Sequence, residues 1–154
     1  MYYTTLYMNA PNLDLKRFEL ALRQRVHRKR LCILIIDPQS LSRQMAIEVL
    51  SHDYEVVTCA SSEQALHYYL HHAPDIVFLD IDNPGMNGLD ILEHIAVLDA
   101  EAYVILLTAR ERPDHHRLRK CVQGHVVKPF TRKKLAQHLY GFGLAYPNRG
   151  TRLA

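Results

Sequence analysis

Short, continuously apolar segments recur along this chain, and they limit most strongly how it can fold. Examples are CILII at 32–36, IVFL at 76–79 and YVILL at 103–107. A strand with one face in water alternates apolar and polar residues, whereas an unbroken apolar run is typical of a strand that is covered on both faces. The sequence therefore predicts an α/β protein whose sheet lies between layers of helices.

Helical patterns alternate with these runs. Residues 40–51 place Leu41, Met45 and Val49 on one face, and Ser61 is a candidate N-cap for the next helix. We expect strands at 32–36, 54–59, 76–79, 103–107 and 125–127, and helices at 40–51, 61–72, 89–98, within 109–124, and at 131–142. Right-handed crossovers between parallel strands would give a doubly wound five-stranded parallel sheet, and a chain of 154 residues suits one such domain.

An additional helix is expected in front of the sheet. Apolar residues recur there at helical spacing, at Leu15, Phe18, Leu22 and Val26, and the basic run HRKR that follows suits a helix C-terminus. We therefore expect an N-terminal extension with an amphipathic basic helix at 1–30, the α/β domain at 31–142, and a loose tail at 143–154.

Charge is distributed unevenly along a chain of net charge +3. Residues 1–30 carry seven basic and two acidic side chains, residues 31–109 one basic and twelve acidic, and residues 110–134 nine basic and two acidic. The acidic middle could attract a divalent cation, and the basic ends could meet an acidic partner, although a solvated surface is the simplest interpretation.

The location of the protein can also be predicted. No apolar stretch is long enough to span a membrane, and the N-terminus has no signal-peptide pattern. The three cysteines are an odd number without CxxC spacing, which favours reduced thiols. We expect a cytoplasmic protein without a membrane partner.

Polar side chains follow four of the predicted strands: Asp37, Asp80, Thr108 and Lys128. In doubly wound sheets, ligands bind beyond the carboxyl ends of the strands, so these side chains should meet. A carboxylate can attack phosphorus to form an aspartyl phosphate, and this transfer needs charge neutralisation more than proton shuttling. A lysine, a hydroxyl and carboxylate-bound Mg²⁺ would supply it.

These motifs resemble the receiver domain of two-component response regulators over residues 31 to about 142. The matching features are Asp37, Asp80 in LDIDNPGMNG, Thr108-Ala109, Lys128-Pro129, Pro84 and Gly88. The resemblance implies a flavodoxin-like sheet of order 2-1-3-4-5, and a single-domain, chemotaxis-regulator-like receiver acting in a phosphorelay.

The resemblance also implies roles for the site residues. Asp80 would accept phosphate from a histidine kinase or a phosphotransfer protein, and Thr108 and Lys128 would contact the phosphoryl group. Mg²⁺ would be held by Asp37, Asp80 and the backbone carbonyl of Asp82.

The switch and the output face follow from the same resemblance, whereas the other partners are judged from the first helix and its basic residues. His125 would occupy the switch position, and the Lys128–Pro129 bond would be cis. A downstream protein would bind the face formed by 110–142, and a homodimer through the first helix is open. Nucleic acid is not an expected partner, because no DNA-reading module follows.

Pro38 departs from the family pattern, which places a second metal-binding acid there. Arg43, six residues after Asp37, falls where receivers often have arginine and supports this register. Proline has no side-chain oxygen, so we expect weak Mg²⁺ binding and slow or absent phosphorylation, with partial compensation from Asp82.

Two other functions remain open. The first is a pseudo-receiver that binds partners without phosphate, which Pro38 favours. The second is a haloacid-dehalogenase-like phosphatase using Asp80, Asp82, Thr108 and Lys128, although this DxD follows the third strand and no acidic pair follows Lys128. As a receiver, the protein would not be an enzyme beyond catalysing its own phosphorylation and dephosphorylation.

Overall fold

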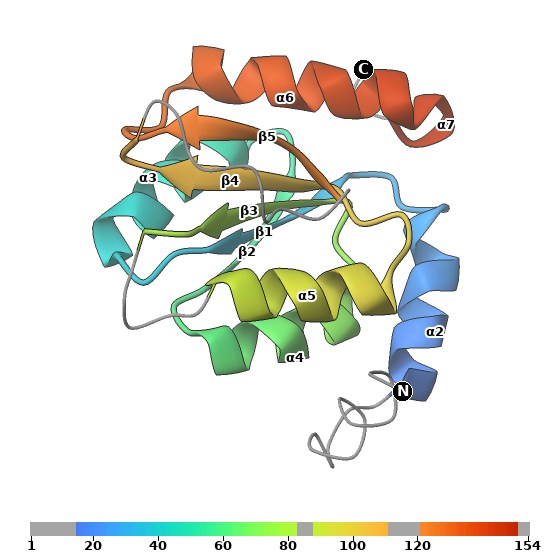
Figure 1. The fold of residues 1–154 in the computed structure, drawn as a ribbon. Helices are drawn as coiled ribbons and strands as arrows, with labels where there is room; N and C mark the ends of the chain where they lie inside the picture. Colours follow the sequence, from blue (N-terminus) through green and yellow to red (C-terminus); the bar gives the residue numbers. More distant parts are fainter. Residues whose placement is uncertain (1–14, 83–87, 111–120, 151–154) are drawn as a thin grey trace.

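The structure, a computed structural model, describes residues 15–82, 88–110 and 121–150. Within them lies one five-stranded sheet, and all neighbouring strands pair in parallel (Figure 1). The strands are β1 (Cys32–Ile36), β2 (Glu55–Cys59), β3 (Ile76–Asp80), β4 (Val104–Thr108) and β5 (Val122–Val127). Their order is β2-β1-β3-β4-β5, which confirms the predicted doubly wound topology.

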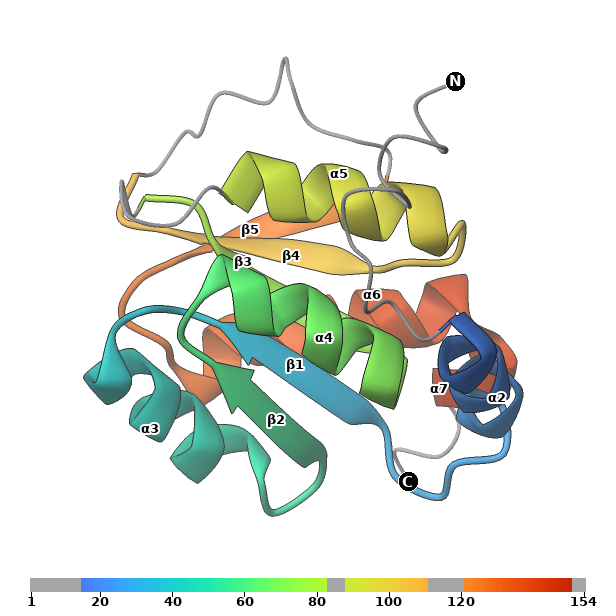
Figure 2. The ribbon, with the colours of Figure 1, turned by 90° about the horizontal axis from the view of Figure 1, so that it is seen from below.

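Helices cover both faces of this sheet, with α3 and α6 on one side and α4 and α5 on the other (Figures 1 and 2). The helices are α2 (Leu15–Arg25), α3 (Ser40–Leu50), α4 (Ser62–His72), α5 (Gly88–Leu98), α6 (Arg132–Ala145) and α7 (Pro147–Gly150). The helix expected within 109–124 falls mostly on 111–120, outside the described residues. No helix among the described residues has the length and apolar character needed to cross a bilayer.

Side-chain caps explain where two of the helices begin. The Ser61 hydroxyl accepts a hydrogen bond from the backbone N–H of Gln64, and the Thr131 hydroxyl accepts one from the backbone N–H of Lys134. Each bond satisfies a backbone donor that has no partner within its own helix. Ser61 and Thr131 are therefore N-caps of α4 and α6, as the sequence predicts.

The core lies on both sides of the sheet. Leu34 and Ile36 of β1 pack in the cluster that includes residues of α4 and α5, whereas Ile33 and Ile35 pack with residues of α3 and α6. Every residue of β1, β3 and β4 is buried, while β2 and β5 at the edges are partly exposed. Burial on both faces is the reason that the central strands are continuously apolar.

Helix α2 packs on the core cluster that includes residues of α4 and α5, and it does so through Phe18 and Leu22 of the predicted stripe. Phe18 is buried, whereas Leu15 and Val26 are 42% and 46% exposed. The buried face also includes Arg25, whose guanidinium donates a hydrogen bond to Asp99 at 2.7 Å. An ion pair, and not the apolar spacing alone, thus decides how this helix is oriented.

The expected loose tail at 143–154 differs from the structure over residues 143–150. These residues complete α6 and form α7. Arg149 is buried, donates to Asp75 at 2.8 Å, and lies over the ring of Phe142 with 5.0 Å to its centroid. This side chain attaches the segment to the sheet, while residues 151–154 lie outside the described residues.

Candidate functional site

Asp37, Asp80, Thr108 and Lys128 lie at the carboxyl ends of β1, β3, β4 and β5. All four strands point the same way, so these ends meet at the edge of the sheet where the arrowheads lie (Figure 1). Asp37, Asp80 and Thr108 are only 0%, 3% and 0% exposed. The sequence prediction that these side chains gather at one edge agrees with the structure.

Lys128 joins the two carboxylates. Its Nζ atom lies 2.7 Å from Oδ2 of Asp37 and forms a still closer ion pair with Oδ2 of Asp80. Burial of the ammonium opposes its charge, but the close interactions with the carboxylates of Asp37 and Asp80 outweigh this effect and raise the pKa of Lys128. One ammonium is therefore shared by two buried acids.

The turn after β1 directs Asp37 inward. Its Oδ1 atom accepts a hydrogen bond from the backbone N–H of Gln39 at 2.9 Å, and its carbonyl accepts one from Arg43 at 2.8 Å. Oδ2 is buried and takes no hydrogen bond of favourable geometry, so its contact with Lys128 is an ion pair. Pro38 lies between these contacts without adding an oxygen ligand.

The donor set suits a hard divalent cation only in part. Carboxylate oxygens are the ligands that Mg²⁺ prefers, and Asp37 and Asp80 both face the position of the lysine ammonium. No group of three or more His, Cys, Asp or Glu side chains in the described parts of the chain is arranged to hold a metal ion. The chemistry is that of a site with two carboxylates instead of three.

Asp82 has a role that the sequence did not reveal. Its backbone N–H donates to Oδ1 of Asp80 at 2.8 Å. Its carboxylate accepts hydrogen bonds from the Thr108 hydroxyl, at 3.1 Å, and from the backbone N–H of Ala109. The sequence suggested a backbone metal ligand at Asp82 and partial compensation for Pro38, but nothing local in the sequence shows that this side chain reaches the end of β4.

The remaining predicted positions are only partly described. The Lys128–Pro129 bond is cis, as expected. His125 lies on β5 opposite Leu106 and is half-buried, and its role as a switch stays a prediction. Gly88 begins α5, where a Cβ atom would lie 3.1 Å from the carbonyl oxygen of Asp80. Pro84 lies outside the described residues.

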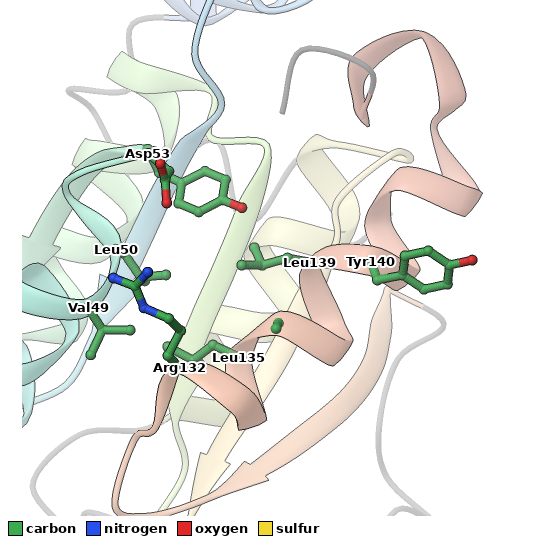
Figure 3. A pocket seen from close by; sticks show the side chains of 9 residues that line it. Val49, Leu50, Asp53, Arg132, Leu135, Leu139 and Tyr140 are labelled. Carbon is green, nitrogen blue, oxygen red and sulfur yellow. The ribbon is translucent and has the colours of Figure 1, made fainter. Parts of the chain in front are cut away.

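A pocket of about 260 Å³ lies elsewhere, between α3 and α6 (Figure 3). Its wall is mainly apolar, with Leu50, Leu135 and Leu139, and Asp53 and Arg132 add charge. None of the predicted site residues lines this pocket. The predicted site residues therefore lie in the polar cluster at the sheet edge and outside this hollow.

Comparison with known proteins agrees with this geometry. Residues 33–140 match the family model of the response regulator receiver domain. The chain is 33% identical over 102 residues to the chemotaxis protein CheY of Bacillus subtilis, covering 64% of this chain and 85% of that protein. It is 36% identical over 101 residues to sporulation initiation phosphotransferase F of the same organism, covering 64% and 82%.

A solved structure of a response regulator also matches this fold. The response regulator protein TrrA from Thermotoga maritima, in complex with Mg²⁺-BeF, is 29% identical, has a TM-score of 0.65, and is matched over 73% of this chain and 98% of that chain. The sheet order and the acids at the ends of β1 and β3 therefore agree with a family match that covers most of the sequence. The chain belongs to the response regulator receiver domain family, whose members are signalling domains of two-component phosphorelays.

Proposed function

We propose that this receiver accepts a phosphoryl group on Asp80, from a histidine kinase or a phosphotransfer protein, and signals by binding a downstream protein. The observation that carries the proposal is the environment of Asp80: a buried carboxylate at the end of a central strand, paired with the Lys128 ammonium. The family match leaves the haloacid-dehalogenase-like alternative without support.

The contacts support a simple transfer. A carboxylate oxygen of Asp80 would attack phosphorus while the bond to the donor breaks, and the electron pair of that bond would leave with the donor group. Lys128 would stabilise the negative charge first on the carboxylate and then on the phosphoryl oxygens, because its ammonium already lies at the attacking group. No proton needs to move between the side chains of the site.

Mg²⁺ is the proposed cofactor, held by Asp37, Asp80 and the backbone carbonyl of Asp82. When bound, it would neutralise charge on the phosphoryl oxygens. We propose weak binding, because Pro38 supplies no oxygen and because the cation must compete with the Lys128 ammonium for both carboxylates.

Intact-mass measurement after incubation with Mg²⁺ and acetyl phosphate tests the phosphoacceptor. The wild-type chain should gain one phosphate, and Asp80→Asn should gain none. Asp53→Asn, which changes an exposed acid just before β2 and away from the carboxyl ends of the strands, is the matched control and should behave as wild type. Uptake by Asp80→Asn would contradict the assignment, and no uptake by the wild type would leave a receiver that acts without phosphate.

Isothermal titration with Mg²⁺ tests the importance of Pro38. A Pro38→Asp variant should bind Mg²⁺ at least about tenfold more tightly, because affinity for such cations rises with the number of charged ligands. Gln44→Asp adds the same charge at an exposed position on α3 and should leave the affinity nearly unchanged. An equal gain in both variants would show only a general effect of charge.

We further propose that the downstream protein binds the face that includes β5 and α6. Arg132 and Lys133 are exposed at the start of α6, and their charge would favour an acidic partner. Leu20 of α2 is 54% exposed, so a homodimer through this helix stays a prediction as well.

A further inference from the structure

Asp82 engages the Thr108 hydroxyl, which the proposed phosphoryl site also needs, and the neighbouring backbone N–H of Ala109. The Thr108 hydroxyl donates to Oδ1 of Asp82 at 3.1 Å, and the backbone N–H of Ala109 donates to Oδ2. Thr108 cannot turn away freely, because it is fully buried and its oxygen also accepts a hydrogen bond from the backbone N–H of Arg110 at 3.0 Å. We call these interactions of Asp82 with Thr108 and Ala109 the Asp82 contact.

The Asp82 contact excludes another acceptor at the same donors. A threonine hydroxyl has a single proton to donate, and a backbone amide likewise has one. While both point at the Asp82 carboxylate, neither can bind a phosphoryl oxygen. A phosphoryl group on Asp80 would also approach the Asp82 charge, because the backbone N–H of Asp82 already lies 2.8 Å from Oδ1 of Asp80.

We propose that the Asp82 carboxylate is a built-in competitor of the phosphoryl group. In the unphosphorylated chain it occupies the donors of Thr108 and Ala109, and it must release them before a phosphoryl group on Asp80 can be bound there. Asp82 thus sets how readily Asp80 is phosphorylated, and it fixes the end of β4 in the absence of phosphate. This inference rests on the proposed function of Asp80.

The first test needs no phosphate. In NMR spectra of the unphosphorylated chain without Mg²⁺, Asp82→Ala should move the Ala109 amide proton upfield and speed its exchange with solvent by about tenfold, as expected when a hydrogen bond to a charged group is lost. Glu48→Ala removes an exposed acid from α3 and is the charge-matched control. An Ala109 amide that is the same in both variants would overturn the inference.

The second test measures phosphate uptake from acetyl phosphate with Mg²⁺. Asp82→Ala should take up phosphate about tenfold faster than the wild type, the equivalent of one hydrogen bond to a charged group. Asp82→Asn, which keeps an oxygen acceptor without the charge, should lie between them, and Glu48→Ala should match the wild type. All of these variants keep the backbone carbonyl of Asp82, so the proposed metal ligands are unchanged.

The possible outcomes separate the inference from the proposed function. Equal uptake by the wild type and Asp82→Ala would overturn the competition while leaving Asp80 as the phosphoacceptor. Uptake by Asp82→Ala alone would support both. Uptake by none of the chains would overturn the proposed function and the competition with it, and the Ala109 amide would then decide only whether the Asp82 contact exists in solution.

Discussion

Lys128 is the side chain on which the electrostatics of the site depend. Asp37 and Asp80 come from different strands, and both carboxylates pair with the same ammonium. Two buried acids without a counter-charge would repel each other and favour protonation. Because the pKa of Lys128 is raised, the ammonium stays charged through the neutral range and offsets part of the negative charge of the two acids.

Replacing Lys128 with methionine tests this interpretation through stability. In the presence of EDTA, Lys128→Met should lower the free energy of unfolding at pH 7 by about 3 kcal/mol, because it leaves buried carboxylates unpaired. A group whose pKa is raised on folding stabilises below its ordinary pKa of 10.5 and loses this contribution as the pH rises through the folded value. Urea unfolding curves should therefore show a difference that narrows above pH 10.5.

Lys133→Met is the matched control, since Lys133 is exposed on α6. It should change the stability by less than about 0.5 kcal/mol at either pH. A loss in Lys128→Met that is no larger than in this control would show that the two ion pairs contribute nothing to the folded state.

Helix α2 is attached to the domain by an ion pair inside the protein. Both side chains of the Arg25–Asp99 pair are only 4% exposed, and Tyr69 donates a further hydrogen bond to Asp99 at 2.6 Å. Burial alone would raise the pKa of Asp99, but the hydrogen bonds and charge of Arg25 and the hydroxyl of Tyr69 lower it. The N-terminal extension is therefore part of the folded domain through α2, beyond the residues 33–140 that match the family model.

Arg25→Met should lower the free energy of unfolding by about 3–5 kcal/mol, the usual cost of breaking a buried ion pair. Arg23→Met lies on the same helix, and its ion pair with Glu19 has side chains that are 77% and 69% exposed, so it should cost less than about 0.5 kcal/mol. Chemical denaturation of both variants gives the comparison. An equal loss of unfolding free energy in both variants would mean that Arg25 contributes no more to stability than a surface arginine does.

The stability that the Arg25–Asp99 pair contributes should depend on pH in a defined direction. The pKa of Asp99 is lowered on folding, so its contribution is present above its ordinary pKa of 3.8 and is lost as the pH falls through the folded value. The stability advantage of the wild type over Arg25→Met should therefore persist at neutral pH and disappear in acid.

At the scale of the whole molecule, β3 connects a cluster of buried ion pairs at one end of the sheet to the proposed site at the other end. Its last residue is Asp80, and Asp75 lies just before its first residue. Asp75 accepts hydrogen bonds from Arg28, at 3.1 Å, and from Arg149, at 2.8 Å. Helices α2 and α7 both lie at the end of the sheet that is opposite the site (Figures 1 and 2). Chain segments at both ends of the described sequence thus stabilise the strand that carries the proposed phosphoacceptor.

Arg149→Met should lower the free energy of unfolding by about 3 kcal/mol, because it leaves a buried carboxylate with one arginine fewer. Asn148→Ala changes the exposed neighbour on α7 and should have little effect. Thermal unfolding of the two variants provides the measurement. If Arg149→Met melts at the wild-type temperature, α7 does not stabilise the domain.

The sequence by itself determined the sheet and which polar side chains gather at its carboxyl edge. Strands buried on both faces must be apolar throughout, so β1, β3 and β4 are visible as unbroken runs. The residue that follows or ends such a strand then lies at the ligand-binding edge, which identifies Asp37, Asp80, Thr108 and Lys128 without a structure. Caps such as Ser61 and Thr131 are local as well, and they could be predicted.

Only the tertiary structure decided which polar side chains meet. Arg25 and Asp99 are 74 residues apart, and so are Arg149 and Asp75, so no local pattern relates either pair. The tail was expected to be loose because its own sequence favours no structure, whereas a contact with Asp75 orders α7. The same holds for Asp82 at the site, because its carboxylate accepts hydrogen bonds from Thr108 and Ala109, which are 26 and 27 residues away in the sequence. Most of the secondary structure follows from neighbours along the chain, whereas the pairing of buried charges, and with it α7, depends on neighbours in space.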